Sequence, residues 1–298
     1  MPPDQIMPAL YATALPSTLA SAVGLFRHRR RGLTDPASMP RIERTLNAAR
    51  IDAAWLKAYR QCVGLTDHDD ALPALALQIA VAPLHLAILA DVQFPFRALG
   101  LVHMSQQVKQ MRAISPTAAI DLLSYTTDAR WEKRGMSFGL VTEARVDGEL
   151  VWQASTRALA PGKSLIELPA ATHLTNDPAT TPCIEQLIDV PENCGRRYAK
   201  IAGDLNPIHQ HALLAKPFGF KRAIVHGTWT LARALAVAGL PRSDRFNFNA
   251  TFRRPVELPS QILVRCYGER DSSSQRIVVQ NPDAATTHLH VKFETSVA

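Results

Sequence analysis

The chain has 298 residues, 47% of them hydrophobic and 20% charged, as is ordinary for a soluble globular protein with a sizeable core. Its four cysteines form no Cys-x-x-Cys pair, which argues against a zinc site, and no apolar run is long enough to span a membrane. The formal net charge of +7 fits two interpretations: a merely basic surface, or one that attracts an anionic, phosphate-bearing ligand.

The first 45 residues match neither of the repeats described below, and we expect residues 1–45 to form an N-terminal extension or lid. Their apolar stretch precedes the basic run Arg27–Arg31, which is the reverse of the order in a secretory signal peptide. Pro8 and Pro16 also interrupt the stretch. With cysteines that need no pairing in a chain of this size, we expect a cytoplasmic protein.

The sequence pattern of residues 46–160 predicts a repeat made of a helix followed by a sheet. A short apolar helix is predicted over Pro83–Asp91, with proline near its first position. Alternation of apolar and polar residues then predicts four strands between residues 100 and 159. Asp147-Gly148 favours a tight hairpin turn between two of these strands. Residues 161–182, rich in proline, threonine and alanine, are typical of a linker.

Residues 183–298 repeat that order. A short helix is predicted over Cys194–Ala202, capped by Asn193, and a structured loop over Gly203–His209. The segment Thr228–Ala238 is apolar nearly all round except for Arg233, so we expect a helix that is wrapped by other structure. The segment from Phe246 alternates with period two, as a half-buried antiparallel strand does.

Two such repeats predict an α+β double hot-dog fold, in which each repeat has a central helix wrapped by an antiparallel β-sheet. The two sheets would join into one continuous layer. Two unrelated α+β domains remain the alternative.

The segment Arg196–Leu235 carries the chemically informative residues. Asp204 and His209 stand five positions apart with Asn206-Pro207 between them, and Pro207 favours a turn over a helix there. A rigid turn can aim two polar side chains at one point. Taken singly, Asp204 fits a loop cap, His209 a surface or core histidine, and His226 a residue that bonds backbone ahead of the helix.

Together these residues resemble the signature of the MaoC-like dehydratases and (R)-specific enoyl-CoA hydratases. That signature is an aromatic residue, three others, Ser or Ala, then Gly-Asp-x-Asn-Pro-aliphatic-His. It is matched by Tyr198, Ala202, Gly203, Asp204, Asn206, Pro207, Ile208 and His209. His226-Gly227 ahead of an apolar helix completes the pattern. The motif is present in the second repeat alone.

The resemblance implies syn addition of water to a trans-2-enoyl thioester, or the reverse elimination. His209 would take a proton from the water, and Asp204 would orient the water and return a proton to the α-carbon. The N–H of Gly227, at the start of the helix, would stabilise the enolate charge on the thioester oxygen. Asn206 and His226 would hold the loop or orient the substrate. The first repeat would have lost its catalytic loop, and its shortened helix would leave room for a bulky acyl chain.

The substrate implied is an acyl-CoA thioester, with coenzyme A as part of the substrate and no separate cofactor or metal. Basic residues after the catalytic loop and in the first strand after the long helix are candidates for its phosphates: Lys216, Lys221, Arg222, Arg253 and Arg254. Exposed surface charges are the alternative for each. No DNA-binding motif or aromatic-interleaved basic patch indicates nucleic acid. Each chain would close its own sheet, and a homodimer of such chains is compatible with that arrangement.

Two other functions compete with this one. A hot-dog thioesterase uses the same fold with differently placed carboxylates, and the Gly-Asp-x-Asn-Pro-x-His order argues against it. A non-catalytic protein that binds acyl-CoA or an acyl carrier protein would not need the Asp204–His209 pair. The sequence leaves acyl-chain length, carrier and physiological direction open.

Overall fold

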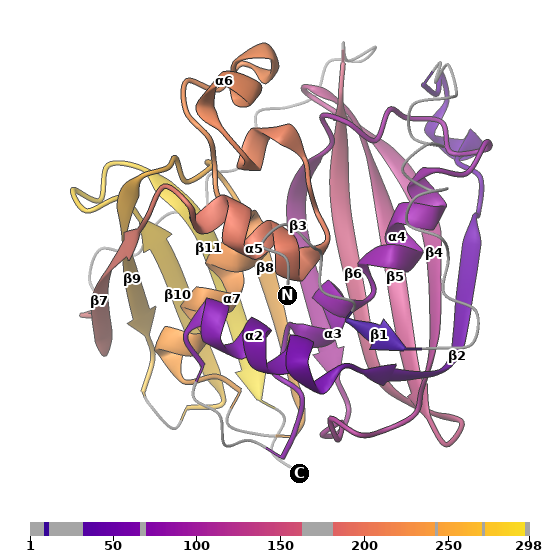
Figure 1. The fold of residues 1–298 in the computed structure, drawn as a ribbon, viewed down its shortest axis with the longest axis horizontal. Coiled ribbons are helices and arrows are strands. Elements are labelled where there is room, and N and C mark those ends of the chain that lie inside the picture. The colour runs from indigo at the N-terminus through magenta and orange to yellow at the C-terminus, as the bar shows by residue number, and fades with distance from the viewer. Residues whose placement is uncertain are drawn as a thin grey trace.

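The computed structural model describes residues 9–11, 32–65, 70–162, 181–241, 244–269 and 272–295. Within this part of the chain, eleven strands form one antiparallel sheet in the order β1-β2-β4-β5-β6-β3-β8-β11-β10-β9-β7. Figure 1 shows that the first half of the chain forms one half of this sheet and the second half forms the other, and that the two meet at β3 and β8. The strands are β1 (Leu10–Tyr11), β2 (Glu43–Ile51), β3 (Val102–Gln110), β4 (Ile120–Glu132), β5 (Gly135–Val146), β6 (Glu149–Pro161), β7 (Ile184–Val190), β8 (Phe246–Phe252), β9 (Ser260–Tyr267), β10 (Ser274–Gln280) and β11 (Thr287–Thr295).

The strand order is the same in both halves. Read from the outer edge inwards, β2-β4-β5-β6-β3 in the first half corresponds to β7-β9-β10-β11-β8 in the second. The two innermost strands pair with each other, with Val108 opposite Phe248. One continuous layer therefore joins two copies of a single topology, as the sequence predicted.

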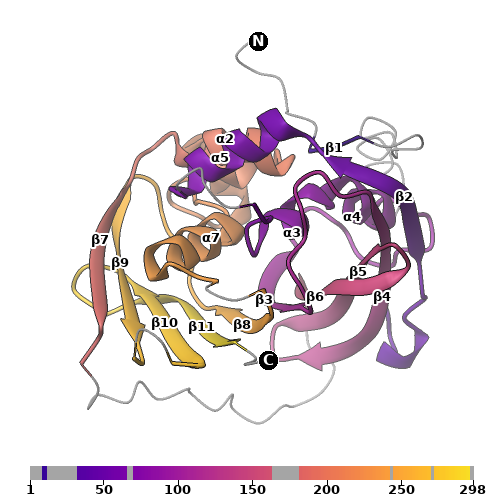
Figure 2. The ribbon, with the colours of Figure 1, turned by 90° about the horizontal axis from the view of Figure 1, so that it is seen from below.

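The helices occupy equivalent places in the two halves. The larger helices are α2 (Ala53–Val63), α3 (Ala76–Ala80), α4 (Ala82–Leu89), α5 (Cys194–Ala202) and α7 (Gly227–Ala238). Figure 2 shows the sheet curving around α7 in one half and around α3 and α4 in the other, while α2 and α5 lie next to each other. This is the expected double hot-dog arrangement of α+β class. No described helix is both long and apolar enough to cross a membrane.

Indole and guanidinium groups join the helices of the two halves. Trp55 Nε1 on α2 donates to the Ile201 carbonyl on α5 at 2.8 Å. From α7, Trp229 Nε1 donates to the Cys62 carbonyl at 3.1 Å. Arg233, the lone charge of α7, donates to the Val63 carbonyl at the C-terminal end of α2 at 3.4 Å. Positive charge at a helix C-terminus offsets the helix dipole, which explains a cation in an otherwise apolar helix.

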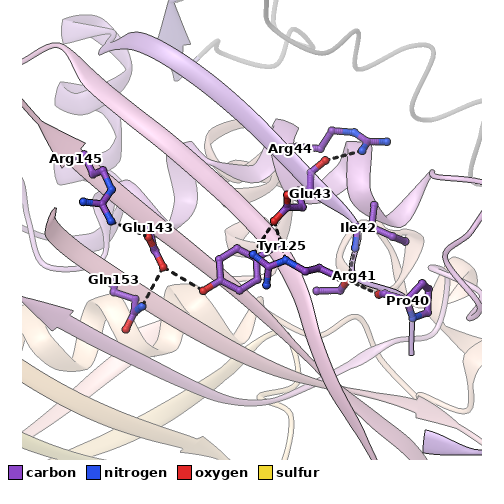
Figure 3. A network of polar contacts seen from close by, with 10 residues as sticks. Pro40, Arg41, Ile42, Glu43, Arg44, Tyr125, Glu143, Arg145 and Gln153 are labelled. Carbon is purple, nitrogen blue, oxygen red and sulfur yellow. Dashed lines mark hydrogen bonds and ion pairs between the residues drawn. The ribbon is translucent and has the colours of Figure 1, made fainter. Parts of the chain in front are cut away.

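The outer face of the first-half sheet is polar. Tyr125 on β4 donates to Glu143 on β5 at 3.1 Å, and the Arg41 guanidinium lies 3.9 Å from the Tyr125 ring centroid. Arg41 also pairs with Glu43 on β2 at 2.6 Å (Figure 3). This charged network marks the face of these strands that points away from the helices.

Most predicted elements are confirmed, with local differences. The Asp147-Gly148 hairpin joins β5 to β6, and both residues have the positive φ that such a turn requires. The predicted helix over Pro83–Asp91 is Ala82–Leu89, and the sequence reading missed α2, α3 and β2. Asn193 does precede α5, but its side chain makes no capping hydrogen bond because its own backbone is already helical.

Two predicted segments fall mostly outside the described residues. These are the linker, of which residues 163–180 are not described, and the extension, of which residues 1–8 and 12–31 are not. The described part of the extension includes β1, which pairs with β2, and β2 itself begins at Glu43. A boundary after residue 45 would therefore cut through the strand next to β1.

Candidate active site

The loop after α5 presents Asp204. Helix α5 ends at Gly203, whose left-handed backbone (φ 68°) reverses the chain direction. The Asp204 carboxylate then accepts a hydrogen bond from the Asn206 N–H at 3.0 Å. Asn206 in turn caps the 3₁₀ turn η2 (Pro207–His209) by accepting from the Ile208 N–H at 3.4 Å. Hydrogen bonds between Asp204 and Asn206 and between Asn206 and Ile208 therefore hold the loop in one conformation. The Asp204 side chain remains 52% exposed.

His209 is buried with one nitrogen already engaged. Its Nδ1 lies 2.8 Å from the Ile224 carbonyl, which can only accept, so Nδ1 carries the proton. The unprotonated Nε2 lies 3.8 Å from the Asp204 Oδ2. The Ile208 carbonyl also accepts from the Ile224 N–H at 3.0 Å, so two hydrogen bonds tie the turn to this segment.

His226 forms the third member of the cluster. Its ring stacks on His209 with centroids 3.6 Å apart, and its Nε2 lies 3.7 Å from the Asp204 Oδ2. The same Nε2 is 3.1 Å from the backbone carbonyl of Asp204, to which it donates. The opposite nitrogen, Nδ1, is buried and has no hydrogen-bond partner. The structure thus brings together three of the predicted site residues.

Burial keeps both imidazoles neutral. Desolvation lowers the pKa of His209, against the opposing effects of the Asp204 carboxylate and the Ile224 carbonyl. Desolvation and the neighbouring His209 lower the pKa of His226 to about 4. A neutral His209 with a free Nε2 beside a carboxylate can accept a proton from a water placed between them.

Gly227 opens α7 directly after His226. Its N–H, at the first helical position, has no partner within the helix. A Cβ at this position would lie 3.0 Å from the Phe252 ring, tighter than ordinary packing allows. The glycine therefore permits both the close approach of Phe252 and access to the helix N-terminus.

Gly195 is a supporting residue that the sequence reading missed. It lies in the first turn of α5, and a Cβ there would be 2.3 Å from the His209 carbonyl oxygen. The helix and the catalytic turn are therefore in backbone contact at this position. The sequence signal was a glycine inside a predicted helix, where glycine is otherwise unfavourable.

The five cation candidates are all exposed, and none pairs with a carboxylate in the described part of the chain. Lys216 begins the 3₁₀ turn η3 (Lys216–Phe218), which follows the short helix α6 (Ala212–Ala215). Arg253 and Arg254 follow Phe252 at the end of β8. Arg222 donates to the Pro259 carbonyl at 3.4 Å, and its exposed guanidinium still faces solvent. All five cations lie in the segments that follow Asp204 and Gly227 along the chain.

The ligand atoms of Asp204, His209 and His226 all lie within 4.8 Å of one another, a donor set that a divalent metal can use. The Nε2 of His226 is already engaged with the Asp204 carbonyl. A metal bound by this nitrogen would have to break that hydrogen bond.

Comparison with known proteins finds a known domain in the second half of the chain and a related dehydratase. Residues 173–288 match the model of the MaoC like domain. The chain is 29% identical over 216 residues, covering 72% of it and 76% of the relative, to the 3-hydroxyacyl-thioester dehydratase X of Mycobacterium tuberculosis.

Solved structures agree over the whole fold. The crystal structure of HtdX from Mycobacterium tuberculosis superposes with a TM-score of 0.72 at 26% identity, covering 86% of this chain and 100% of that one. A MaoC-like dehydratase from Phytophthora capsici gives 0.68 at 17% identity, covering 88% and 96%, and shares the fold. The second half of the chain therefore carries a MaoC-like domain, and the double hot-dog that contains it is similar to a hydro-lyase, the dehydratase HtdX.

Proposed function

We propose that this protein interconverts (3R)-3-hydroxyacyl and trans-2-enoyl thioesters of coenzyme A by removing or adding one water. The observation that carries the proposal is the Asp204–His209 pair, with the free Nε2 of a neutral His209 3.8 Å from the Asp204 carboxylate. The name of the relative in Mycobacterium tuberculosis, a 3-hydroxyacyl-thioester dehydratase, supports the same substrate class.

In the hydration direction, one water molecule is held between Asp204 and His209. Its oxygen bonds to the β-carbon while its proton leaves for His209 Nε2. A proton passes from the pair through Asp204 to the α-carbon, and the pair returns to its starting state. The sum is one water added across the double bond, with both new bonds on the face that the pair occupies.

The α-carbon can accept this proton because the thioester carbonyl takes up negative charge as an enolate. The N–H of Gly227 at the start of α7 supplies a hydrogen-bond donor and the positive end of the helix dipole. Asn206 fixes the turn between the two catalytic side chains, and His226 holds the Asp204 backbone by its hydrogen bond at 3.1 Å. Lys216, Lys221, Arg222, Arg253 and Arg254 are the proposed contacts for the phosphates of coenzyme A.

The test is an assay of enoyl-CoA and 3-hydroxyacyl-CoA substrates with two readouts. Loss of the conjugated enoyl absorbance, with formation of the (3R)-hydroxy product, is the expected result. Release of free thiol without hydration would indicate a thioesterase, and binding without turnover would indicate a non-catalytic acyl-CoA protein. Either outcome would overturn the proposal.

The proposal includes one site per chain. The sequence of the first half lacks the Gly-Asp-x-Asn-Pro-aliphatic-His signature, so calorimetric titration with a non-reactive enoyl-CoA analogue should give a stoichiometry near one. Two equivalent sites per chain would contradict the assignment of Asp204 and His209 as the sole pair.

A further inference from the structure

The inner face of the first-half sheet carries polar side chains where the second half carries apolar ones. In the second half, inward-facing positions of β8, β10 and β11 are occupied by residues such as Phe248, Ile277 and Val291. In the first half, four neighbouring strands instead place hydroxyl and amide groups inward, and α3 and α4 add a glutamine and a histidine. We call this set the polar band: Gln78, His85, Gln106, Ser124, Thr142 and Thr156.

Hydrogen bonds divide the polar band into two chains. His85 Nε2 on α4 lies 2.8 Å from the Thr142 hydroxyl, which lies 2.8 Å from the Ser124 hydroxyl. In the other chain, Gln78 Nε2 on α3 donates to the Thr156 hydroxyl at 3.3 Å. Thr156 then donates to Gln106 Oε1 at 2.8 Å.

One acceptor of the polar band has no partner. Gln78 is 7% exposed, and its Oε1 is buried without any hydrogen bond. An unpaired buried carbonyl costs about 1 to 3 kcal/mol, so such an atom calls for a donor from outside the fold. The nitrogen of the same amide bonds Thr156, which holds the amide group in place beside the polar band.

A continuous line of side chains joins the polar band to the active site. Gly227 lies against Phe252, at 3.0 Å for a Cβ built on the glycine. Phe252 packs on His103, with ring centroids 4.5 Å apart. His103 precedes Gln106 on β3, and the Gln106 side chain acts on its pKa. Phe252, His103, Thr156 and His85 are all partly exposed, unlike most of the surrounding core.

The polar band is suited to a neutral group. Desolvation lowers the pKa of both His85 and His103 to about 4, so neither is charged at neutral pH. Ionic groups of the same strands face the opposite side of the sheet, as in the pair of Tyr125 and Glu143 (Figure 3). A carboxylate would find no cation among the six residues of the polar band, whereas a hydroxyl could both donate and accept.

We infer that the polar band binds a hydrogen-bond donor of the substrate, a hydroxyl on the acyl tail beyond the reacting double bond, with Gln78 Oε1 as its acceptor. The inference rests on the proposed function, since it places the tail of an enoyl thioester bound at Asp204 and His209. The enzyme then prefers acyl chains oxygenated along the tail over plain chains of equal length.

The experiment compares enoyl-CoA substrates of one chain length, in which a single hydroxyl is moved along the tail or omitted. We expect one hydroxylated isomer to exceed the plain chain in kcat/KM by about fivefold to tenfold, the effect of one hydrogen bond to a buried acceptor. Gln78→Met keeps the length of the side chain and removes the acceptor, so in this variant the two substrates should have equal kcat/KM. Gln110→Met is the matched control, because buried Gln110 lies on β3 but bonds the Asp244 carbonyl outside the polar band.

The assay separates a failure of the inference from a failure of the proposed function. A plain chain preferred over every hydroxylated isomer would overturn the inference and leave the proposed function intact. No hydration of any enoyl-CoA would overturn the proposed function itself. The pantetheine arm also carries hydroxyl and amide donors. If Gln78→Met lowered kcat/KM for crotonyl-CoA by the same factor as for the long substrates, the arm would occupy the polar band and the tail assignment would be wrong. Should Gln78→Met not fold, Thr156→Val removes the partner of Gln78 and must reduce the same ratio.

Discussion

Helices α2 and α5 hold the same place in the two halves, and both end in a left-handed glycine. Gly64 has φ 72° and Gly203 has φ 68°. After Gly203 the chain continues as Asp-Leu-Asn-Pro-Ile-His and leads through a long connection to the glycine at the start of α7. After Gly64 it continues as Leu-Thr-Asp-His-Asp-Asp, and α3 already begins at Ala76. Residues 66–69 of this segment, which include His68 and Asp69, lie outside the described part of the chain.

The comparison separates the scaffold from the chemistry. Strand order, helix placement and the left-handed helix end are common to both halves, so none of these features makes a catalytic site. The second half adds a capped turn that carries His209 against His226, and a central helix that begins with glycine. In the first half the central helix is interrupted at Val81, ahead of Ala82-Pro83, and begins with no glycine. A protein with one catalytic half and one half that lacks the catalytic signature can specialise the former for reaction and the latter for binding.

The largest effect is expected from the catalytic pair. Asp204→Asn and His209→Ala should each lower kcat by about 100-fold to 10,000-fold, the range for acid–base groups, when enoyl-CoA hydration is measured. The double variant should be little slower than the slower single variant, because both groups act on one water. Asp121→Asn is the matched control, since Asp121 lies in the first half and accepts from the Ala48 N–H, a bond that an asparagine oxygen can also accept. Folded single variants with near-normal turnover would remove the catalytic assignment.

Acid sensitivity should come from both halves. His85 and His103 in the first half and His226 in the second have pKa values near 4 when folded and about 6.5 when unfolded. The unfolded chain therefore binds more protons below pH 6.5, and stability present above that pH is lost as pH falls towards 4. Each histidine should remove about 2 kcal/mol between pH 7 and pH 5. Urea unfolding at the two pH values measures this loss.

His85→Gln should make the pH dependence of unfolding shallower, because the amide can keep the Thr142 hydrogen bond without titrating. A loss between pH 7 and pH 5 that does not change in His85→Gln would show that this histidine is not held neutral by burial.

The sequence anticipated those features that depend on pattern. Period-two alternation predicted the strands on both sides of the molecule, and the uniformly apolar segment at residues 228–238 predicted the wrapped helix. The signature predicted that Asp204 and His209 converge because its proline and glycine exclude a regular helix between them. The motif also predicted His226 and Gly227 as site residues. His226 does cluster with Asp204 and His209, and Gly227 follows it as the first residue of α7.

Other features depended on contacts that no local pattern shows. Strand β2 contains Asn47 and a left-handed Ala48, which interrupt its alternation, so it was missed. The cap expected from Asn193 failed because the residue is already helical. The role of Gly195 depends on the carbonyl of His209, fourteen positions along the chain and brought close only by folding. The polar band likewise requires the register of four strands, since its members are far apart in sequence.

A substitution at Gly195 tests how the scaffold supports the site. Glycine to alanine inside a helix ordinarily stabilises by about 0.5 to 1 kcal/mol. Helix α2 has Ala54 at the corresponding second position, where no catalytic turn lies above it. In α5 the added Cβ would meet the His209 carbonyl at 2.3 Å, so the turn must move. Gly195→Ala should therefore lower kcat by roughly tenfold, on the scale of a misplaced catalytic group.

Gly162→Ala is the control for this substitution, because a Cβ there would have open space. Equal kcat values in Gly195→Ala and Gly162→Ala would show that the contact between α5 and the turn does not position His209.

The smallest effect concerns the exposed cations of the second half. Arg253 and Arg254 are two of the proposed phosphate contacts. They follow Phe252, whose ring packs against Gly227, at the end of β8. Attraction between exposed charges is screened over about 8 Å at physiological ionic strength, so added salt should raise KM for enoyl-CoA by about threefold and leave kcat unchanged. Replacing both arginines by glutamine should raise KM at low salt and flatten its salt dependence. Lys133 is an exposed cation in the turn between β4 and β5 of the first half, so Lys133→Gln should leave the salt dependence of KM unchanged. If Lys133→Gln and the double arginine variant changed the salt dependence of KM equally, the effect would come from net charge. These arginines would then have no particular role in holding coenzyme A.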